Sequence, residues 1–138
     1  MTFTVERLPN DPMIIITFSG AVNADMVAQA TLNVEALLSE YRVNTVLVFD
    51  TTKAETDFKH ILEILQETTG ADPDEEAVDF TILTAFVGTS AMIKLYINAA
   101  RQKQFGGQTF PLFATLEDAI TAMRISLASL TTEKKVLD

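Results

Sequence analysis

The chain has 138 residues, of which 48% are hydrophobic and 21% are charged, and this composition indicates a globular protein of one domain's length. Its formal net charge is −9, from 19 acidic and 10 basic side chains. This charge argues against duplex nucleic acid or an anionic membrane as the main partner, because both attract excess Lys and Arg. The absence of Cys and the single His exclude a disulfide scaffold, a thiolate metal site and a multi-His metal site. We predict neither a metal nor a cofactor.

The longest strongly apolar run, residues 13–16, is too short to cross a bilayer, so no integral membrane segment is expected. The first seven residues lack the basic segment and apolar core of a signal peptide. These features predict a cytoplasmic protein. The sequence contains no repeat, low-complexity tract or linker, so we expect a single domain over residues 1–130 and a polar, frayed tail over 131–138.

Strand-like and helix-like segments alternate along the chain. The connection at residues 8–12 is rich in turn residues and too short for a crossover, so the first two strands are expected to form an antiparallel hairpin. The alternation that follows predicts an α/β fold, with one mostly parallel sheet of about five strands and about four helices packed on it. Asn23 and Thr115 are the expected N-caps of the first and last helices. The expected strands cover residues 2–7, 13–19, 45–50, 80–87 and 109–113, and the expected helical stripes lie within 27–41, 58–65, 91–105 and 116–127.

The acidic residues are concentrated in one part of the chain. Residues 50–79 carry ten acidic and two basic side chains, whereas no acidic residue lies between Asp79 and Glu117. One interpretation is a solvated acidic loop; the other is a polarised surface that selects a basic partner or drives head-to-tail self-association. The acidic run at 72–79 lacks the Gly and the closing Glu of an EF-hand loop, so it predicts no specific metal site.

A candidate anion site lies at the start of the third predicted helix. Gly88, Thr89 and Ser90 follow a buried strand, at the position where ligands collect in open α/β sheets and where a helix N-terminus presents free N–H groups. Lys94 and Arg101 lie near one face of the same helix and supply positive charge. The alternative is structural: Gly88 makes the turn, and Thr89 or Ser90 caps the helix.

The third predicted helix is apolar around most of its circumference. Such a helix is either deeply buried or has one apolar face covered by a partner, for example a second copy in a two-fold dimer. Tyr96 can offer its hydroxyl to a ligand, although a buried Tyr hydroxyl more often meets a backbone carbonyl. The candidate site for a small anionic or lipidic ligand comprises Gly88, Thr89, Ser90, Lys94, Tyr96 and Arg101.

A second candidate is the segment Asp50-Thr51-Thr52-Lys53, which follows the third predicted strand. A hydroxyl here can accept a phosphate at the start of the next helix. The alternative is a strand-to-helix loop with capping hydroxyls, and the neighbouring carboxylates would repel a phosphate. The single histidine, His60, lies outside the apolar stripe of the second predicted helix and is interpreted as a surface residue. The sequence contains no convincing catalytic constellation, and we predict that the chain is not an enzyme.

The order of the elements and three segments resemble the SpoIIAA-like group of STAS-like proteins. The segments are residues 46–50 (VLVFD), 85–96 (AFVGTSAMIKLY) and 113–119 (FATLEDA), the last being a short strand followed by a capped helix. The resemblance covers residues 3–128. The same group resembles the CRAL-TRIO lipid-transfer fold, which adds a lipid ligand by analogy.

The resemblance implies a small cytoplasmic regulatory or ligand-binding module. Anti-sigma antagonists of the STAS family switch by phosphorylation of a Ser or Thr after the strand's Asp, which corresponds here to Thr51 or Thr52 after Asp50. Lys53 stands where that family has Gly. The leading hypothesis is a non-enzymatic module that binds a protein partner or self-associates as a homodimer. The alternative is a carrier or sensor of a small anionic or lipidic ligand, which predicts a concave apolar pocket near Gly88; an enzyme ranks last.

Overall fold

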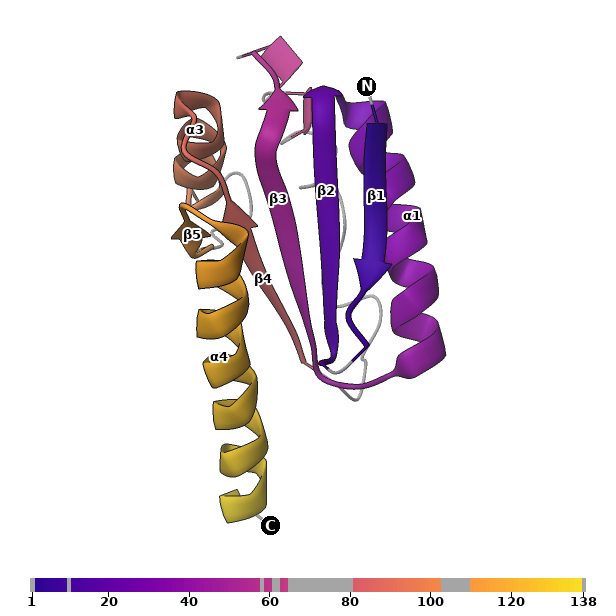
Figure 1. The fold of residues 1–138 in the computed structure, drawn as a ribbon, viewed down its shortest axis with the longest axis vertical. Coiled ribbons are helices and arrows are strands. Elements are labelled where there is room, and N and C mark those ends of the chain that lie inside the picture. Colours follow the sequence, from indigo (N-terminus) through magenta and orange to yellow (C-terminus); the bar gives the residue numbers. More distant parts are fainter. Residues whose placement is uncertain are drawn as a thin grey trace.

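A computed structural model describes residues 2–9, 11–57, 59–60, 63–64, 81–102 and 110–137, with side chains as far as residue 129. The chain forms one five-stranded sheet with helices packed against it (Figure 1). In chain order the elements are β1 (Thr2–Arg7), β2 (Met13–Ala21), α1 (Ala24–Tyr41), β3 (Thr45–Glu55), β4 (Ile82–Val87), α3 (Ala91–Ala100), β5 (Leu112–Phe113) and α4 (Leu116–Leu137).

The strands lie in the sheet in the same order as in the chain, β1-β2-β3-β4-β5. Strands β1 and β2 pair antiparallel, with Phe3 opposite Phe18, and every other neighbouring pair is parallel. This arrangement confirms the predicted hairpin and the mostly parallel α/β sheet. The parallel strands β2, β3 and β4 are rich in Ile, Val and Phe because both faces of the sheet are covered by helices.

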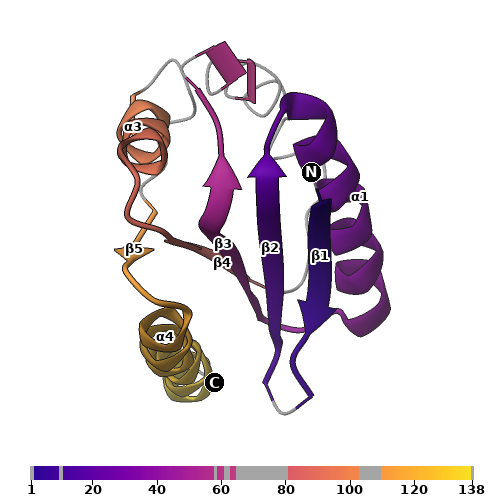
Figure 2. The same ribbon diagram turned by 45° about the horizontal axis from the view of Figure 1, so that its top comes forward.

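Two hydrophobic layers lie on the two faces of the sheet. Helix α4 covers one face, and helices α1 and α3 cover the other; Figure 2 shows α3 and α4 on either side of β5. Alternate residues of β3 enter the two layers, since successive side chains of a strand point to opposite faces. Fully buried side chains of the α4 layer include Met13, Val46, Val48 and Val87, and those of the α1 layer include Ile14 and Ile16.

The helices begin at side-chain caps. Asn23 accepts a hydrogen bond from the backbone N–H of Met26 at 2.9 Å, and Thr115 accepts one from the N–H of Asp118 at 3.2 Å. Each bond satisfies a donor that the first turn of a helix leaves free. Both predicted N-caps are confirmed.

Strand β3 is longer than predicted. The sequence predicts that this strand ends at Asp50, with a loop and a helix after it. This prediction is wrong, because the strand continues to Glu55. Beyond the end of β4, the polar residues of β3 keep pairing with β2, with Lys53 opposite Ser19 and Ala54 opposite Gly20. Backbone pairing with one neighbour therefore holds five polar and small residues in a strand that their side chains alone do not indicate.

The described residues contain three helices rather than the four that were expected. Of the second predicted helix, residues 59–60 and 63–64 have helical backbone, and Phe58, Leu62 and Leu65 lie outside the described residues. The acidic run at 72–79 also lies outside them. Helix α4 continues through residues 131–137, where a frayed tail was expected. Among the described residues, no helix has both the length and the apolar character needed to cross a membrane.

Candidate functional site

The predicted phosphate-accepting segment forms an irregularity within β3. Between the pairs Thr17–Asp50 and Ser19–Lys53, the single residue Phe18 lies opposite both Thr51 and Thr52. Extra residues of this kind bend a strand and are common beside functional sites. One side-chain oxygen of Asp50 stabilises the bend, because it accepts hydrogen bonds from the N–H of Thr52 at 3.0 Å and from its hydroxyl at 2.7 Å.

Thr51 ties this bend to the end of β4. Its hydroxyl donates a hydrogen bond to the carbonyl of Val87 at 2.7 Å, and the next residue, Gly88, is buried against it. A Cβ added at Gly88 would clash with the Thr51 hydroxyl oxygen and would lie 3.3 Å from the Cγ2 of Ile93. Gly88 does not have a positive φ. The close approach of Thr51, rather than a left-handed turn, therefore requires glycine here.

The remaining residues of the predicted anion site are divided between cap and surface. The Ser90 hydroxyl oxygen accepts a hydrogen bond from the N–H of Ile93 at 3.2 Å, so Ser90 caps α3 as the structural alternative predicts. Thr89, Lys94 and Arg101 are exposed. The helix start and the two basic residues are thus present as predicted, but Lys94 and Arg101 do not line a common cavity with Ser90.

Helix α3 buries most of its apolar surface. Ile93, Ile97 and Ala100 are buried, and the half-buried residues include Leu95 and Tyr96. The exposed positions of α3 form one stripe of small, polar or basic residues: Ala91, Lys94 and Asn98. Of the two explanations for the apolar helix, burial within its own chain accounts for the observed pattern.

A cavity of about 260 Å³ lies between the sheet and helices α1 and α3. Ser90 and Tyr96 from the predicted ligand site line it, together with Thr51 from the bend in β3. Val27 and Thr31 of α1 line the other side, so residues far apart in the sequence enclose the space. Gly88, Thr89, Lys94 and Arg101 are not among its described lining residues.

A row of aromatic rings forms the sheet side of this cavity. The rings of Phe18 and Phe49 stack with centroids 6.3 Å apart, and those of Phe49 and Phe86 stack at 5.2 Å. Tyr96 and Phe110 pack against Phe86 with centroids 5.6 and 5.2 Å away. This row was not predicted from the sequence, because Phe18, Phe49 and Phe86 come from separate strands. The signal available was that Phe18, Phe49 and Phe86 each lie one residue before the end of a predicted strand.

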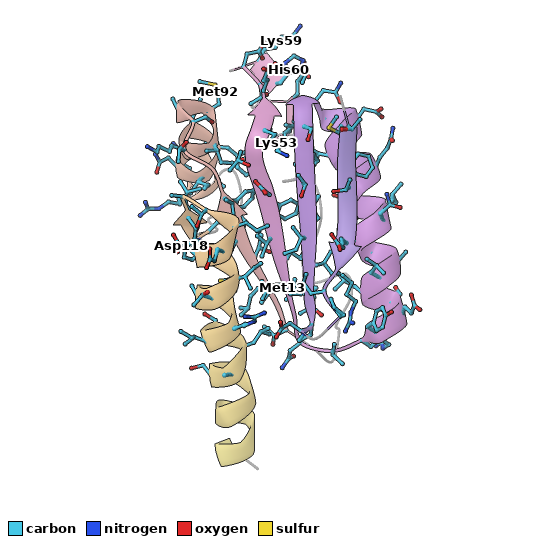
Figure 3. The ribbon with its side chains drawn as sticks, in the orientation of Figure 1. Met13, Lys53, Lys59, His60, Met92 and Asp118 are labelled. Carbon is cyan, nitrogen blue, oxygen red and sulfur yellow. The ribbon has the colours of Figure 1, made fainter. Side chains whose placement is uncertain are left out.

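The end of the sheet beyond β3 carries polar and charged side chains. Figure 3 shows Lys53, Lys59 and His60 gathered there, with Met92 of α3 at the same end of the molecule. His60 was predicted to be a surface residue, and its side chain is 38% exposed. Its Nδ1 lies 2.7 Å from the carboxylate of Asp57, and its backbone N–H donates to the same oxygen at 2.9 Å.

These two contacts affect the ionisation of Asp57. The hydrogen bond from the backbone N–H of His60 is the main cause that holds the pKa of the Asp57 carboxyl below its usual range, and the bond to the imidazole adds to it. Asp57 is exposed, so the arrangement is that of a helix cap at the surface. Within the described residues, no three His, Asp or Glu side chains are grouped as metal ligands would be.

Comparison with solved structures identifies the fold of this chain. The chain is similar to an uncharacterised protein of the DUF3478 family with a SpoIIAA-like fold from Shewanella loihica PV-4, with 16% identity, a TM-score of 0.55, and coverage of 87% of this chain and 90% of that one. It is also similar to the anti-sigma factor antagonist SpoIIAA in its unphosphorylated form, with 15% identity, a TM-score of 0.54, and coverage of 89% and 98%.

A third similar structure is an anti-sigma factor antagonist from Mycobacterium paratuberculosis, with 22% identity, a TM-score of 0.51, and coverage of 89% of this chain and 93% of that one. No protein-family model and no curated protein sequence matches the chain. The fold is therefore SpoIIAA-like, of the STAS type, as the sequence resemblance implied. At these identities the likeness establishes the fold and not the activity.

The close approach of Thr51 and Gly88 leads to a prediction about the free energy of unfolding. Gly88→Ala is expected to destabilise the protein by about 1–3 kcal/mol, because the new methyl group overlaps the Thr51 hydroxyl. Thr51→Ala removes that hydroxyl and costs about 1 kcal/mol through the lost hydrogen bond to Val87. The double variant is expected to be more stable than the sum of the two single effects predicts, as measured by urea denaturation. Additive effects would show that the two residues do not constrain each other.

The contacts of Asp57 make a prediction about pH. Because its pKa is lower in the folded chain than in the unfolded one, the carboxylate stabilises the fold above the unfolded pKa, and this contribution is lost as the pH falls through the folded pKa. A carbon-detected NMR titration is expected to give a lowered pKa that remains lowered in His60→Ala, since the backbone N–H is still present. A return to the usual aspartate value in His60→Ala would instead identify the imidazole as the main cause.

Proposed function

We propose that this chain is a non-enzymatic regulatory module that acts by binding another protein. The observation that carries the proposal is the likeness of its fold to two anti-sigma factor antagonists over 89% of the chain. An anti-sigma factor antagonist, as the term says, acts on another protein, the anti-sigma factor. The proposed function is therefore that of a protein-binding regulator.

The end of the sheet at which β3 passes β4 is the proposed binding surface. Thr52 and Lys53 of β3 are exposed there, and Thr89 is exposed just after β4. Three observations support this choice: the bend in β3, the concentration of exposed polar groups, and the tendency of open α/β sheets to bind at the carboxyl ends of their strands. A surface of this composition suits a partner that offers hydrogen bonds and charge rather than a large apolar patch.

Phosphorylation of Thr52 is the proposed switch on this surface. Of the two candidate residues, Thr52 is exposed, whereas Thr51 is half-buried and donates its hydrogen bond to Val87. A phosphate on Thr52 would replace the hydroxyl that now donates to Asp50 and would lie beside that carboxylate. It would add a charge of about −2 and repel Asp50, so it would disturb the bend in β3 as well as the charge of the surface.

The test uses the full chain as bait for a partner from its native host, followed by titration calorimetry with the purified partner. Thr52→Asp is expected to weaken binding at least tenfold, because it places a negative charge beside Asp50. Thr52→Asn has a similar size and no charge, so it is expected to bind within about threefold of the original chain. Ser39→Asp adds the same charge on an exposed position of α1, far along the helix from its start, and serves as the second control.

Three results would count against the proposal. The first is the absence of any partner bound in stoichiometric amount. The second is equal binding by Thr52→Asp and the original chain. The third is equal loss in Thr52→Asp and Ser39→Asp, which would indicate a general charge effect. Capture of a second copy of this chain, with a dimer mass in sedimentation, would identify self-association as the interaction. Intact mass of the protein from its host shows whether the chain carries phosphate, and peptide mapping shows whether that phosphate is on Thr52.

A further inference from the structure

We propose that the cavity between the sheet and helices α1 and α3 binds a small, neutral, mainly aromatic molecule. This site is distinct from the proposed protein-binding surface, and its test does not depend on that function. The inference rests on the composition of the cavity wall, on the arrangement of its aromatic rings, on its unused hydrogen-bonding groups and on its volume.

The described residues of the cavity wall disfavour a charged ligand. Its described lining residues are apolar, aromatic or carry a hydroxyl, and none of them is charged. A carboxylate or phosphate would lose its hydration there without gaining a cation, which is strongly unfavourable. The basic residues of the predicted anion site, Lys94 and Arg101, are exposed and lie outside that lining. A neutral ligand is therefore the one that the cavity suits.

The aromatic row favours a flat ligand. The planes of Phe18 and Phe49 are within 6° of parallel, and those of Phe49 and Phe86 within 20°. Phe110 meets Phe86 edge-on at 64° and Tyr96 is tilted at 54°, so both stand up from the row at one end. A planar ring can lie against the row while its edge meets the upright rings, and both are favoured geometries for aromatic pairs.

Two hydroxyl groups provide polar contacts for such a ligand. In the described part of the chain the Thr84 hydroxyl has no hydrogen-bond partner, although it lines the cavity. The Ser90 hydroxyl accepts a bond from Ile93 and retains its own proton for donation. The hydroxyls of Thr31, Thr51 and Thr56 already donate to backbone carbonyls. The cavity thus fits a ligand with one or two hydrogen-bonding groups on an otherwise apolar frame.

The volume limits the size of the ligand. A dry apolar cavity of about 150 Å³ admits benzene. The cavity here, at about 260 Å³, admits a molecule of two fused rings. Naphthalene derivatives with one small polar group are therefore suitable probes. A long acyl chain is flexible and has no flat face to lie against the aromatic row, so a comparison with such a chain separates an aromatic ligand from a fatty-acid ligand in the same experiment.

The first test compares three probes by titration calorimetry on the full chain. We expect 2-naphthol to bind, and 2-naphthoate, which has nearly the same size and carries a negative charge, to bind at least tenfold more weakly. Dodecanoate is also expected to bind at least tenfold more weakly than 2-naphthol. No binding of 2-naphthol, or a preference for 2-naphthoate or dodecanoate, would overturn the proposal.

The second test places the probe within the cavity. Thr31→Phe adds a ring at the α1 side and is expected to weaken 2-naphthol binding at least tenfold, and Ala54→Phe is expected to do the same from β3. Ala28→Phe adds the same ring on α1 at an exposed position outside the described lining, and is expected to leave binding unchanged. Circular dichroism checks that each variant is folded. Equal binding by Thr31→Phe, Ala54→Phe and Ala28→Phe would contradict this site.

The third test concerns the polar contact. Thr84→Val keeps the shape of the side chain and removes its hydroxyl. It is expected to weaken 2-naphthol binding by roughly two- to tenfold, the effect of one hydrogen bond, and to leave naphthalene binding unchanged. Equal losses for the two probes would show that the substitution alters the cavity itself, and would contradict the proposed role of Thr84.

Discussion

Strand β3 is buried on both faces, and the rest of the structure depends on this constraint. Val46 and Val48 lie under helix α4, whereas Leu47 and Phe49 pack in the layer of α1 and α3. The same strand pairs with β2 on one side and with β4 on the other. A strand in this position must be apolar at nearly every residue, and it determines where both helical layers lie. Its departure from that rule after Asp50 is therefore informative.

After Asp50 the strand loses β4 as a neighbour but keeps β2. The bend at this point separates two consecutive threonines: Thr51 lines the cavity and is bonded to Val87, whereas Thr52 is exposed and bonded to Asp50. The proposed ligand site and the proposed protein-binding surface are thus adjacent in sequence, but they are made by different side chains. Thr52 itself is not among the described residues that line the cavity.

The sequence predicted those features of the fold that short-range patterns determine. Apolar runs located the central strands, and the caps Asn23 and Thr115 located the starts of two helices. The continuation of β3 was not predictable in this way, because Thr-Thr-Lys-Ala-Glu has the composition of a loop and is extended only by its pairing with β2. A cavity near Gly88 was expected only under the hypothesis that the chain carries or senses a small ligand. The row of aromatic rings depends on the register between separate strands. The local sequence around Phe18, Phe49 or Phe86 does not indicate that register.

The two sides of helix α3 explain why the cavity, rather than the helix start, is the stronger candidate for a small ligand. Ile93 and Tyr96 line the cavity, whereas Lys94 lies on the exposed stripe, so the spacing of the helix separates the apolar wall from the positive charge. At the helix start, Ser90 already satisfies the N–H of Ile93, which an anion would otherwise use. A ligand that required both the helix start and Lys94 would have to lie at the surface, where water competes for every contact. A neutral ring in the cavity instead displaces water from an apolar wall. For a molecule of that size, this hydrophobic contribution to binding is larger than the contribution of contacts at the exposed helix start.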